Sequence, residues 1–309
     1  MAEETIHPVL PEDFPDPSVS TSKYDGFYYA HATQGKREPN IQVARSTDLV
    51  RWELLPHGAL AEKPSFARNC RDFWAPSPLV REDNQFRFYY TVKPDDHPGL
   101  GISVAVSEQP DRGFMDRRSG PLRQDTGFRV IDPHYLLDPR TGMKWLYWGS
   151  HEAPISVQAL REDGLDFELG SEPKAVLSPP GDEPFRRLLE GFFVVYHEAT
   201  GRFFGFASGS NTWKPHEYGI SVYWAPDPDA QFVPIPGDNV IVRPTARWLA
   251  PGQCSFVMDE AGDPWLYHHA VDAHDPRNEW ATRAIYRIMC RTKLTFEDGY
   301  PRAIGSAPR

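Results

Sequence analysis

The sequence predicts an all-β fold, a five-bladed β-propeller, from three observations. One unit, an anchor run followed by a turn and an aromatic run, occurs five times, with anchors at Asp16, Trp74, Asp132, Glu190 and Gln253, which lie 58, 58, 58 and 63 residues apart. Each unit carries short runs rich in β-branched and aromatic residues, which favour strands. No amphipathic helical stretch of about ten or more residues is present. A fixed period of short strands is typical of sheets repeated around an axis.

The runs of each unit give the expected strands in order. The anchor run comes first and lines the central channel, and the aromatic run follows it. A third run is IQVARS, ISVAVS, ISVQAL, GISVYWA or AIYRIMC in the successive units, and a weaker fourth run is represented by FELGSE at 167–172. Four strands per unit and five units make up the predicted propeller.

The predicted blades cover nearly the whole chain. They span about 14–60, 70–122, 127–178, 186–244 and 248–304, and the turn-rich segment 93–101 is expected to be a loop. Residues 1–13 are predicted to be an N-terminal lead-in, and residues 14–309 a single catalytic propeller domain. A propeller must close its ring, and a strand from the segment before Phe14, added to the last blade, would do so.

Composition excludes several classes of function. The net charge of −10 without a basic cluster disfavours nucleic acid as a partner. The three cysteines do not form a disulfide framework, and no run of 18 apolar residues predicts a membrane span. The N-terminus has no signal-peptide pattern. We therefore expect a cytoplasmic protein, with a secreted protein whose signal has been removed as the alternative.

Three acidic anchors carry the predicted chemistry. Asp16, Asp132 and Glu190 each adjoin apolar residues and are expected to converge at the channel from three blades. Burial perturbs the pKa of a carboxyl group, which suits it to general acid or base work. Two carboxylates about 6.5–9.5 Å apart hydrolyse a glycosidic bond with inversion. The alternative is that each acid only occupies a turn or a strand edge.

The motifs around these anchors resemble those of a known family. FPDPSV at 14–19, FWAPSPLV at 73–80, VIDPHYLLD at 130–138 and LLEGFFVVY at 188–196 are similar to the successive motifs of glycoside hydrolase family 43. The resemblance spans about 14–302 and includes WLYHHAVD at 265–272 and LTFEDGYPR at 294–302. It implies a five-bladed propeller that cleaves arabinose- or xylose-containing glycans with inversion.

The resemblance also implies roles for individual residues. Asp16 would be the general base, Glu190 the general acid, and Asp132 the residue that modulates the pKa of the acid. Trp74 would present a ring to a sugar, with blade packing as the alternative, and Arg287 would bind sugar hydroxyls in the channel, with a surface charge as the alternative. Of the neighbouring His268 and His269, we expect one to lie in the core or behind the site.

A departure from the family pattern concerns metal binding. Many members have Pro-Gly-His at the start of the fifth blade, with the histidine near a calcium or other ion, whereas this chain has Pro251-Gly252-Gln253. Gln253 offers a carbonyl oxygen, which hard cations accept. The expectation is that the chemistry requires no cofactor, and that a structural Ca²⁺ in the central channel with Gln253 as a ligand is possible.

These observations predict an inverting glycoside hydrolase. The predicted reaction releases terminal α-L-arabinofuranosyl or β-D-xylosyl residues from short oligosaccharides. One alternative is an endo-1,5-α-L-arabinanase, which needs an open groove. An alternative of another class is a non-catalytic carbohydrate-binding propeller, for which Glu190→Gln would leave function intact.

Overall fold

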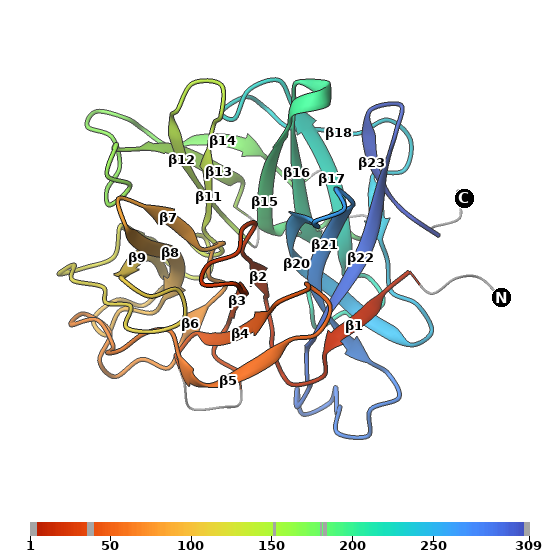
Figure 1. The fold of residues 1–309 in the computed structure, drawn as a ribbon, viewed down its shortest axis with the longest axis horizontal. Coiled ribbons are helices and arrows are strands. Elements are labelled where there is room, and N and C mark those ends of the chain that lie inside the picture. Colours follow the sequence, from red (N-terminus) through yellow and green to blue (C-terminus); the bar gives the residue numbers. More distant parts are fainter. Residues whose placement is uncertain (1–4, 36–39, 151–152, 180, 182–183, 306–309) are drawn as a thin grey trace.

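The computed structural model describes residues 5–35, 40–150, 153–179, 181 and 184–305. Their strands form five antiparallel sheets, and Figure 1 shows these sheets arranged around a common centre. The five-bladed propeller predicted from the repeat is therefore confirmed. The first strand of each blade lies innermost, and the later strands lie progressively outward.

The blades follow the sequence in order. The first contains β2 (Ser18–Val19), β3 (Tyr28–Ala32), β4 (Gln42–Ser46) and β5 (Glu53–Gly58). The second contains β6 (Phe73–Trp74), β7 (Val80–Glu82), β8 (Gln85–Val92), β9 (Gly101–Ser107) and β10 (Arg123–Gln124). The third contains β11 (His134–Leu137), β12 (Lys144–Trp148), β13 (Ile155–Leu160) and β14 (Lys174–Leu177).

The last two blades are larger. The fourth contains β15 (Glu190–His197), the short 3₁₀ turn η1 (Glu198–Thr200), β16 (Arg202–Gly209), β17 (Gly219–Ala225), β18 (Val233–Pro234) and β19 (Val240–Val242). The fifth contains β20 (Trp248–Met258), β21 (Pro264–Asp272), β22 (Ile288–Glu297) and β23 (Tyr300–Ala303). The predicted loop at 93–101 is confirmed, because it joins β8 to β9.

The N-terminal segment closes the ring. Strand β1 (His7–Leu10) pairs antiparallel with β22, with His7 opposite Arg291 (Figure 1). The closure suggested by the sequence is confirmed, so the boundary placed at residue 14 falls after the first strand of the fold. One sheet therefore contains both the first and the last strand of the described residues.

Two strand expectations were wrong in detail. FELGSE is not the fourth strand of the third blade: after Phe167 forms an isolated bridge to Leu160, a turn at Gly170 (φ 75°) interrupts the pairing, and the strand resumes at Lys174. In the fifth blade, the third strand begins at Ile288, so most of AIYRIMC precedes it. Arg287 consequently lies just before β22, so the alternation of side chains between the two faces of a strand does not set the direction of its side chain.

The core lies between neighbouring blades. One buried cluster combines Tyr147 of β12 with Phe192 and Phe203 of β15 and β16. Another combines Phe206 of β16 with Phe256 of β20, whose rings stack 6.1 Å apart. Aromatic side chains bury large apolar areas, and so this packing holds each blade against the next. No helix in the described residues is long and apolar enough to cross a membrane.

Candidate active site

In each blade, the chain reaches the channel at one residue whose backbone is left-handed, and this residue is called the kink of the blade. These residues are Asp16, Ala75, Asp132, Gly191 and Gln253, with φ between 41° and 58°. Such angles are uncommon for residues other than glycine and gather at functional sites. Asp16 and Asp132 occupy this kink, whereas Glu190 lies one residue before it. The equal spacing of the three acids therefore hides a difference in their structural position.

The kinks are held by the preceding blades. At four of them, the backbone N–H donates to a side chain at the end of the second strand of the blade before: Ala75 to Thr33 Oγ1 (2.8 Å), Asp132 to Thr91 Oγ1 (2.9 Å), Gln253 to Ser208 Oγ (2.7 Å) and Asp16 to His269 Nδ1 (3.3 Å). Buried backbone donors require such partners. The pattern joins the blades where they surround the channel.

The fourth kink is held differently, and this difference positions Asp132. Gly149 is the equivalent of Thr33 in the third blade. The N–H of Thr33 donates to Pro15 O, just before Asp16, and the N–H of Gly149 donates in the same way to Ile131 O, just before Asp132. Gly149 has no side chain to offer. The N–H of Gly191 donates instead to Asp132 Oδ2 at 2.9 Å. Asp132 is thereby tied to the residue that follows Glu190.

Asp16 has the surroundings of an ionised carboxylate. Arg287 Nη1 donates to its Oδ1 at 2.8 Å, and Thr33 Oγ1 donates to its Oδ2 at 2.5 Å. Burial alone would raise the pKa of Asp16, but the charge of Arg287, the neighbouring His269 and the hydroxyl of Thr33 hold it well below its usual value. Asp16 therefore stays ionised and can accept a proton from water.

Glu190 has the opposite character. It is the first residue of β15, and its Oε1 accepts from the Tyr218 hydroxyl at 2.7 Å and its Oε2 from Ser150 Oγ at 2.9 Å. Burial raises the pKa of Glu190, and the two hydroxyls oppose that rise only in part. A carboxyl group whose pKa is raised in this way is suited to general acid catalysis.

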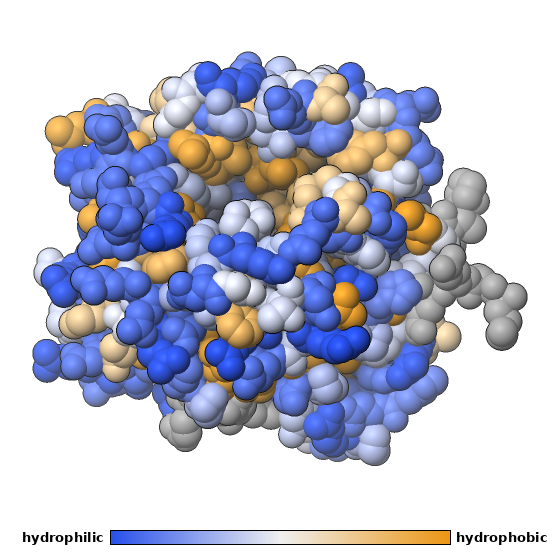
Figure 2. All heavy atoms as spheres, viewed as in Figure 1, coloured by the Kyte–Doolittle hydropathy of each residue, from blue (hydrophilic) through white to orange (hydrophobic). Residues whose placement is uncertain are grey.

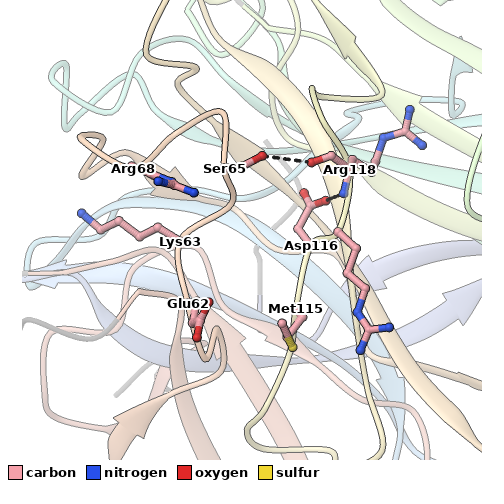
Figure 3. Close-up of a pocket in the computed structure, with 8 residues that line it drawn as sticks. Glu62, Lys63, Ser65, Arg68, Met115, Asp116 and Arg118 are labelled. Carbon is pink, nitrogen blue, oxygen red and sulfur yellow. Dashed lines mark hydrogen bonds between the residues drawn. The ribbon is translucent and has the colours of Figure 1, made fainter.

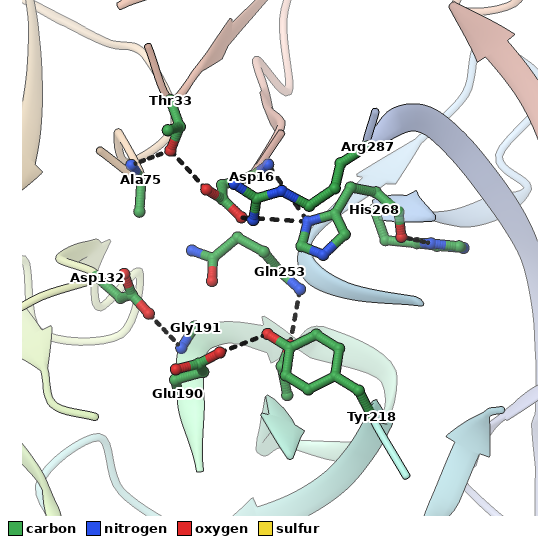
Figure 4. Close-up of polar contacts among 12 residues, drawn as sticks. Asp16, Thr33, Ala75, Asp132, Glu190, Gly191, Tyr218, Gln253, His268 and Arg287 are labelled. Carbon is green, nitrogen blue, oxygen red and sulfur yellow. Dashed lines mark hydrogen bonds and ion pairs between the residues drawn. The ribbon is translucent and has the colours of Figure 1, made fainter. Parts of the chain in front are cut away.

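Asp132 lies close enough to Glu190 and Asp16 for their negative charges to change its pKa. Burial and the negative charges of Glu190 and Asp16 raise its pKa well above the usual value. Figure 4 shows Asp132 and Glu190 on one side of the Gln253 side chain and Asp16 with Arg287 on the other. The three acids predicted from sequence are thus brought together at the channel.

The other predicted site residues also lie near the channel. Arg287 is paired with Asp16, and its backbone N–H donates to Asp13 Oδ1 at 3.1 Å. Trp74 is half-buried, and its ring stacks on Phe128 with 6.3 Å between centroids and an interplanar angle of 8°. One face of Trp74 is therefore covered by the ring of Phe128, and Phe128 itself is 48% exposed.

The surroundings of Gln253 bear on the structural Ca²⁺ suggested by the sequence, which stays a prediction. Its Oε1 lies so close to Gly191 that a Cβ there would meet it at 2.0 Å. The cavity on the axis, which Asp132 and Gln253 help to line, measures about 10 Å³. Within the part of the chain that the structure describes, no three His, Cys, Asp or Glu side chains are grouped to hold a metal. Calcium takes six to eight oxygen ligands, and the proposed reaction does not use a metal.

Several residues near the acids could not be assigned from sequence. Ser150 ends an aromatic run, but Thr33 and Tyr218 carry no local signal, because their partners lie 17 and 28 residues away. Of the two histidines, His268 is buried against Thr292, while His269 contacts Asp16 and stacks on Tyr218 at 6.1 Å.

A cavity opens beside Glu190. It measures about 300 Å³ and is lined by Phe128, Ile131, Ser150, Leu188, Glu190, Asn211, Thr212, Trp213 and Arg283. This volume is at the lower end of the range for small-molecule sites, about 300–1,000 Å³. Its walls come from loops of the third, fourth and fifth blades. An acid poised beside a cavity of this size can act on one or a few sugar units.

Two other hollows lie away from the acids. One, of about 460 Å³, has Arg68 and Lys63 on one side and Arg118 on the other, and Figure 3 shows that these cations do not point toward one another. The other, of about 1000 Å³, is mainly apolar and lies at the end of β15 remote from Glu190. Figure 2 shows apolar residues around this hollow between β11 and β15. None of the three acids lines either one.

The comparison with known families decides the identity of the fold. The profile described as Glycosyl hydrolases family 43 matches residues 5–301. The chain belongs to this family. The resemblance drawn from the sequence motifs is therefore confirmed, and the protein is a family-43 glycoside hydrolase.

Two curated family-43 relatives bear names of arabinan-degrading enzymes. An extracellular endo-α-(1→5)-L-arabinanase of Thermotoga petrophila is 24% identical over 254 residues, which cover 70% of this chain and 50% of the relative. A probable arabinan endo-1,5-α-L-arabinosidase D of Emericella nidulans is 29% identical over 172 residues, which cover 51% and 44%. The chain spans about half the length of the curated relatives it matches.

Solved structures share the family-43 propeller. A thermostable family-43 glycoside hydrolase is 24% identical with a TM-score of 0.79, and the match covers 99% of this chain and 97% of the other. The α-L-arabinanase of Cellvibrio cellulosa in complex with arabinohexaose is 18% identical with a TM-score of 0.75, covering 94% and 95%. At these identities the comparison shows the fold alone.

Replacing Gly191 by alanine tests whether the fourth blade needs a glycine where it reaches the channel. The residue has φ 58°, and an added Cβ would meet Gln253 Oε1 at 2.0 Å. We expect the variant to lose about 1–2 kcal/mol of unfolding free energy from the backbone alone, and more from the clash. Urea denaturation measures this loss. Gly170→Ala, at φ 75° with open space around it, is the matched control for the backbone part.

Proposed function

We propose that this family-43 chain is an inverting hydrolase of α-L-arabinofuranosyl linkages in arabinan-type chains. Asp16 is the general base, Glu190 the general acid, and Asp132 the modulator of the acid. The observation that carries the proposal is the opposite perturbation of two carboxyl groups at one channel, with the pKa of Asp16 lowered and that of Glu190 raised. Such a separation of pKa values is how a site assigns acid and base.

The proposed mechanism is a single displacement. Asp16 accepts a proton from water as the water oxygen attacks the anomeric carbon from the face opposite the leaving group. Glu190 donates its proton to the glycosidic oxygen as the C–O bond breaks. The products are a sugar of inverted configuration and the shortened chain, with Asp16 protonated and Glu190 ionised until the two carboxyls exchange protons with solvent.

The neighbouring residues prepare this step. Arg287 holds Asp16 ionised and fixes one of its oxygens, while Thr33 fixes the other. Tyr218 and Ser150 orient the carboxyl of Glu190. The negative charge of Glu190 raises the pKa of Asp132, so these two neighbouring carboxyl groups oppose each other's ionisation, and in this way Asp132 modulates the acid. These contacts keep the reacting groups in place without reorganisation during the displacement.

Internal cleavage of arabinan is the favoured mode, because both curated relatives are named as endo-acting arabinan enzymes. Release of terminal arabinofuranosyl or xylosyl residues is a second candidate, favoured by the modest volume of the cavity beside Glu190, about 300 Å³. The two modes produce different fragments. Internal cuts give a ladder of oligosaccharides at early times, whereas terminal release gives monosaccharide from the start.

The test is to incubate the protein with linear α-1,5-arabinan, arabinotriose, p-nitrophenyl α-L-arabinofuranoside and p-nitrophenyl β-D-xyloside. Chromatography of early products distinguishes the two modes, and proton NMR of the first anomer distinguishes inversion from retention. We expect arabinan oligosaccharides with inverted anomers. Hydrolysis of the xyloside alone would contradict the proposed linkage. Binding of arabinan without hydrolysis of any substrate would favour a carbohydrate-binding propeller instead.

The Tyr218 hydroxyl is expected to tune the pH range of the reaction. Activity needs Asp16 ionised and Glu190 protonated, so it is lost at high pH as Glu190 ionises. The Tyr218 hydrogen bond lowers the pKa of Glu190 and opposes the effect of burial. Tyr218→Phe should therefore shift the alkaline limb of the pH profile of kcat/KM to higher pH and leave the acid limb, set by Asp16, in place. A shift to lower pH would contradict this assignment.

A further inference from the structure

The cavity beside Glu190 lies on the leaving-group side of the proposed reaction. Glu190 and Ser150, which donates to Glu190 Oε2, line it, whereas Asp16, Asp132 and Arg287 do not. In an inverting displacement, the base and water act on one face of the sugar, and the acid meets the departing oxygen on the other. A cavity that contains the acid but not the base is therefore where the first sugar beyond the broken bond would lie.

Two exposed aromatic side chains line this cavity. Phe128, from the loop before β11, is 48% exposed, and Trp213, from the loop between β16 and β17, is 39% exposed. Phe128 is supported from behind by the stacked ring of Trp74. Large aromatic side chains are usually buried, so two of them exposed within one cavity indicate a binding surface. The C–H faces of a sugar ring suit such surfaces.

Trp213 is held in place by its own loop and by the fifth blade. Its backbone N–H donates to Asn211 Oδ1 at 2.9 Å, and Lys214 closes the turn with a bond to Asn211 O at 2.8 Å. The guanidinium of Arg283, from the loop between β21 and β22, lies 5.0 Å from the centroid of the indole ring. An arginine in this position stacks on the ring and fixes its orientation. With Arg283 in place, the side chain of Trp213 is still 39% exposed.

We propose that Phe128, Trp213 and Arg283 form the subsite that binds the first sugar of the leaving group, a neutral arabinofuranosyl unit of the substrate chain. This inference rests on the proposed hydrolysis of arabinan-type chains. Phe128 and Trp213 contact the apolar faces of the sugar, and Arg283 holds Trp213 and donates to hydroxyl groups. Binding energy gained there supports catalysis at the neighbouring bond, because contacts away from the reacting atoms position the substrate.

The test compares two substrates that differ only in the leaving group. Arabinotriose places a sugar in the subsite, whereas methyl α-L-arabinofuranoside places only a methoxy group there. For Trp213→Ala and Phe128→Ala, we expect kcat/KM for arabinotriose to fall by about tenfold or more relative to the fall for the methyl glycoside. Leu169→Ala, which truncates a 78% exposed side chain outside this cavity, is the control and should change neither value.

Each outcome bears on one proposal. Equal losses on both substrates in correctly folded variants, verified by thermal melting, would overturn the subsite. A variant that fails to fold is replaced by Trp213→Leu or Phe128→Leu, which keep apolar volume without the flat ring, and the same ratio is measured. A wild-type protein that hydrolyses neither arabinotriose nor arabinan would instead contradict the proposed function. The failure of one proposal is thus distinguishable from the failure of the other.

Discussion

Glu190→Gln is expected to lower kcat on linear arabinan by about 10²–10⁴-fold, the range that general acid catalysis contributes. The amide keeps the shape of the side chain; its oxygen can accept from one of the two hydroxyls, Tyr218 or Ser150, and its NH₂ group can donate to the other, but it has no acidic proton to give to the glycosidic oxygen. Burial already disfavours the charged form of Glu190, so a neutral amide of the same shape suits this site. Folding should therefore be preserved, which circular dichroism and thermal melting verify.

The identity of Glu190 as the acid is tested by the leaving group. An arabinofuranoside of 2,4-dinitrophenol departs as a stable anion and needs little protonation, so the loss in Glu190→Gln should be far smaller with this substrate than with arabinan. Glu260→Gln, at a surface residue paired with Lys23, is the matched control and should match the wild type. Equal, large losses on both substrates would show that Glu190 is not the acid.

Asp16→Asn is expected to lower kcat by about 10²–10⁴-fold as well, but equally for both leaving groups. The base acts on the attacking water, and its removal slows that attack whatever group departs. The substitution also leaves the Arg287 guanidinium without its carboxylate partner. A modest loss of stability should accompany the loss of activity.

Two measurements separate the loss of the base from a disturbed site. Arabinotriose should still bind to Asp16→Asn, as calorimetry measures. Thr33→Val removes one hydrogen bond to Asp16 without removing the carboxylate, and it should cost much less activity. An Asp16→Asn variant that hydrolyses arabinan at the wild-type rate would exclude Asp16 as the base.

Together, Glu190→Gln and Asp16→Asn distinguish the general acid from the general base, which neither substitution does alone. Sensitivity to the leaving group marks the residue that protonates the departing oxygen, and insensitivity marks the residue that activates water. The opposite pKa shifts of Glu190 and Asp16 lead to the same assignment. The chemistry of each residue is thus tested independently of the other.

The sequence by itself determined the architecture and the identity of the acidic anchors. Its repeat carries strands in a regular order, and short strands of this kind bury their apolar faces only by packing blade against blade. The sequence singles out Asp16, Asp132 and Glu190 because each adjoins apolar residues, and charged side chains are rarely buried among such residues unless they are paired. The closing strand was also deducible, because a ring of blades must be completed by some part of the chain.

Only the tertiary structure decided how each acid is used. Glu190 lies one residue before its kink while Asp16 and Asp132 occupy theirs, and a spacing of 58 residues does not reveal that difference. The groups that set the pKa values come from other blades: Arg287 reaches Asp16 across 271 positions of sequence. Contacts of this kind depend on how the blades pack around the channel, and so they cannot be predicted from the residues adjacent in sequence.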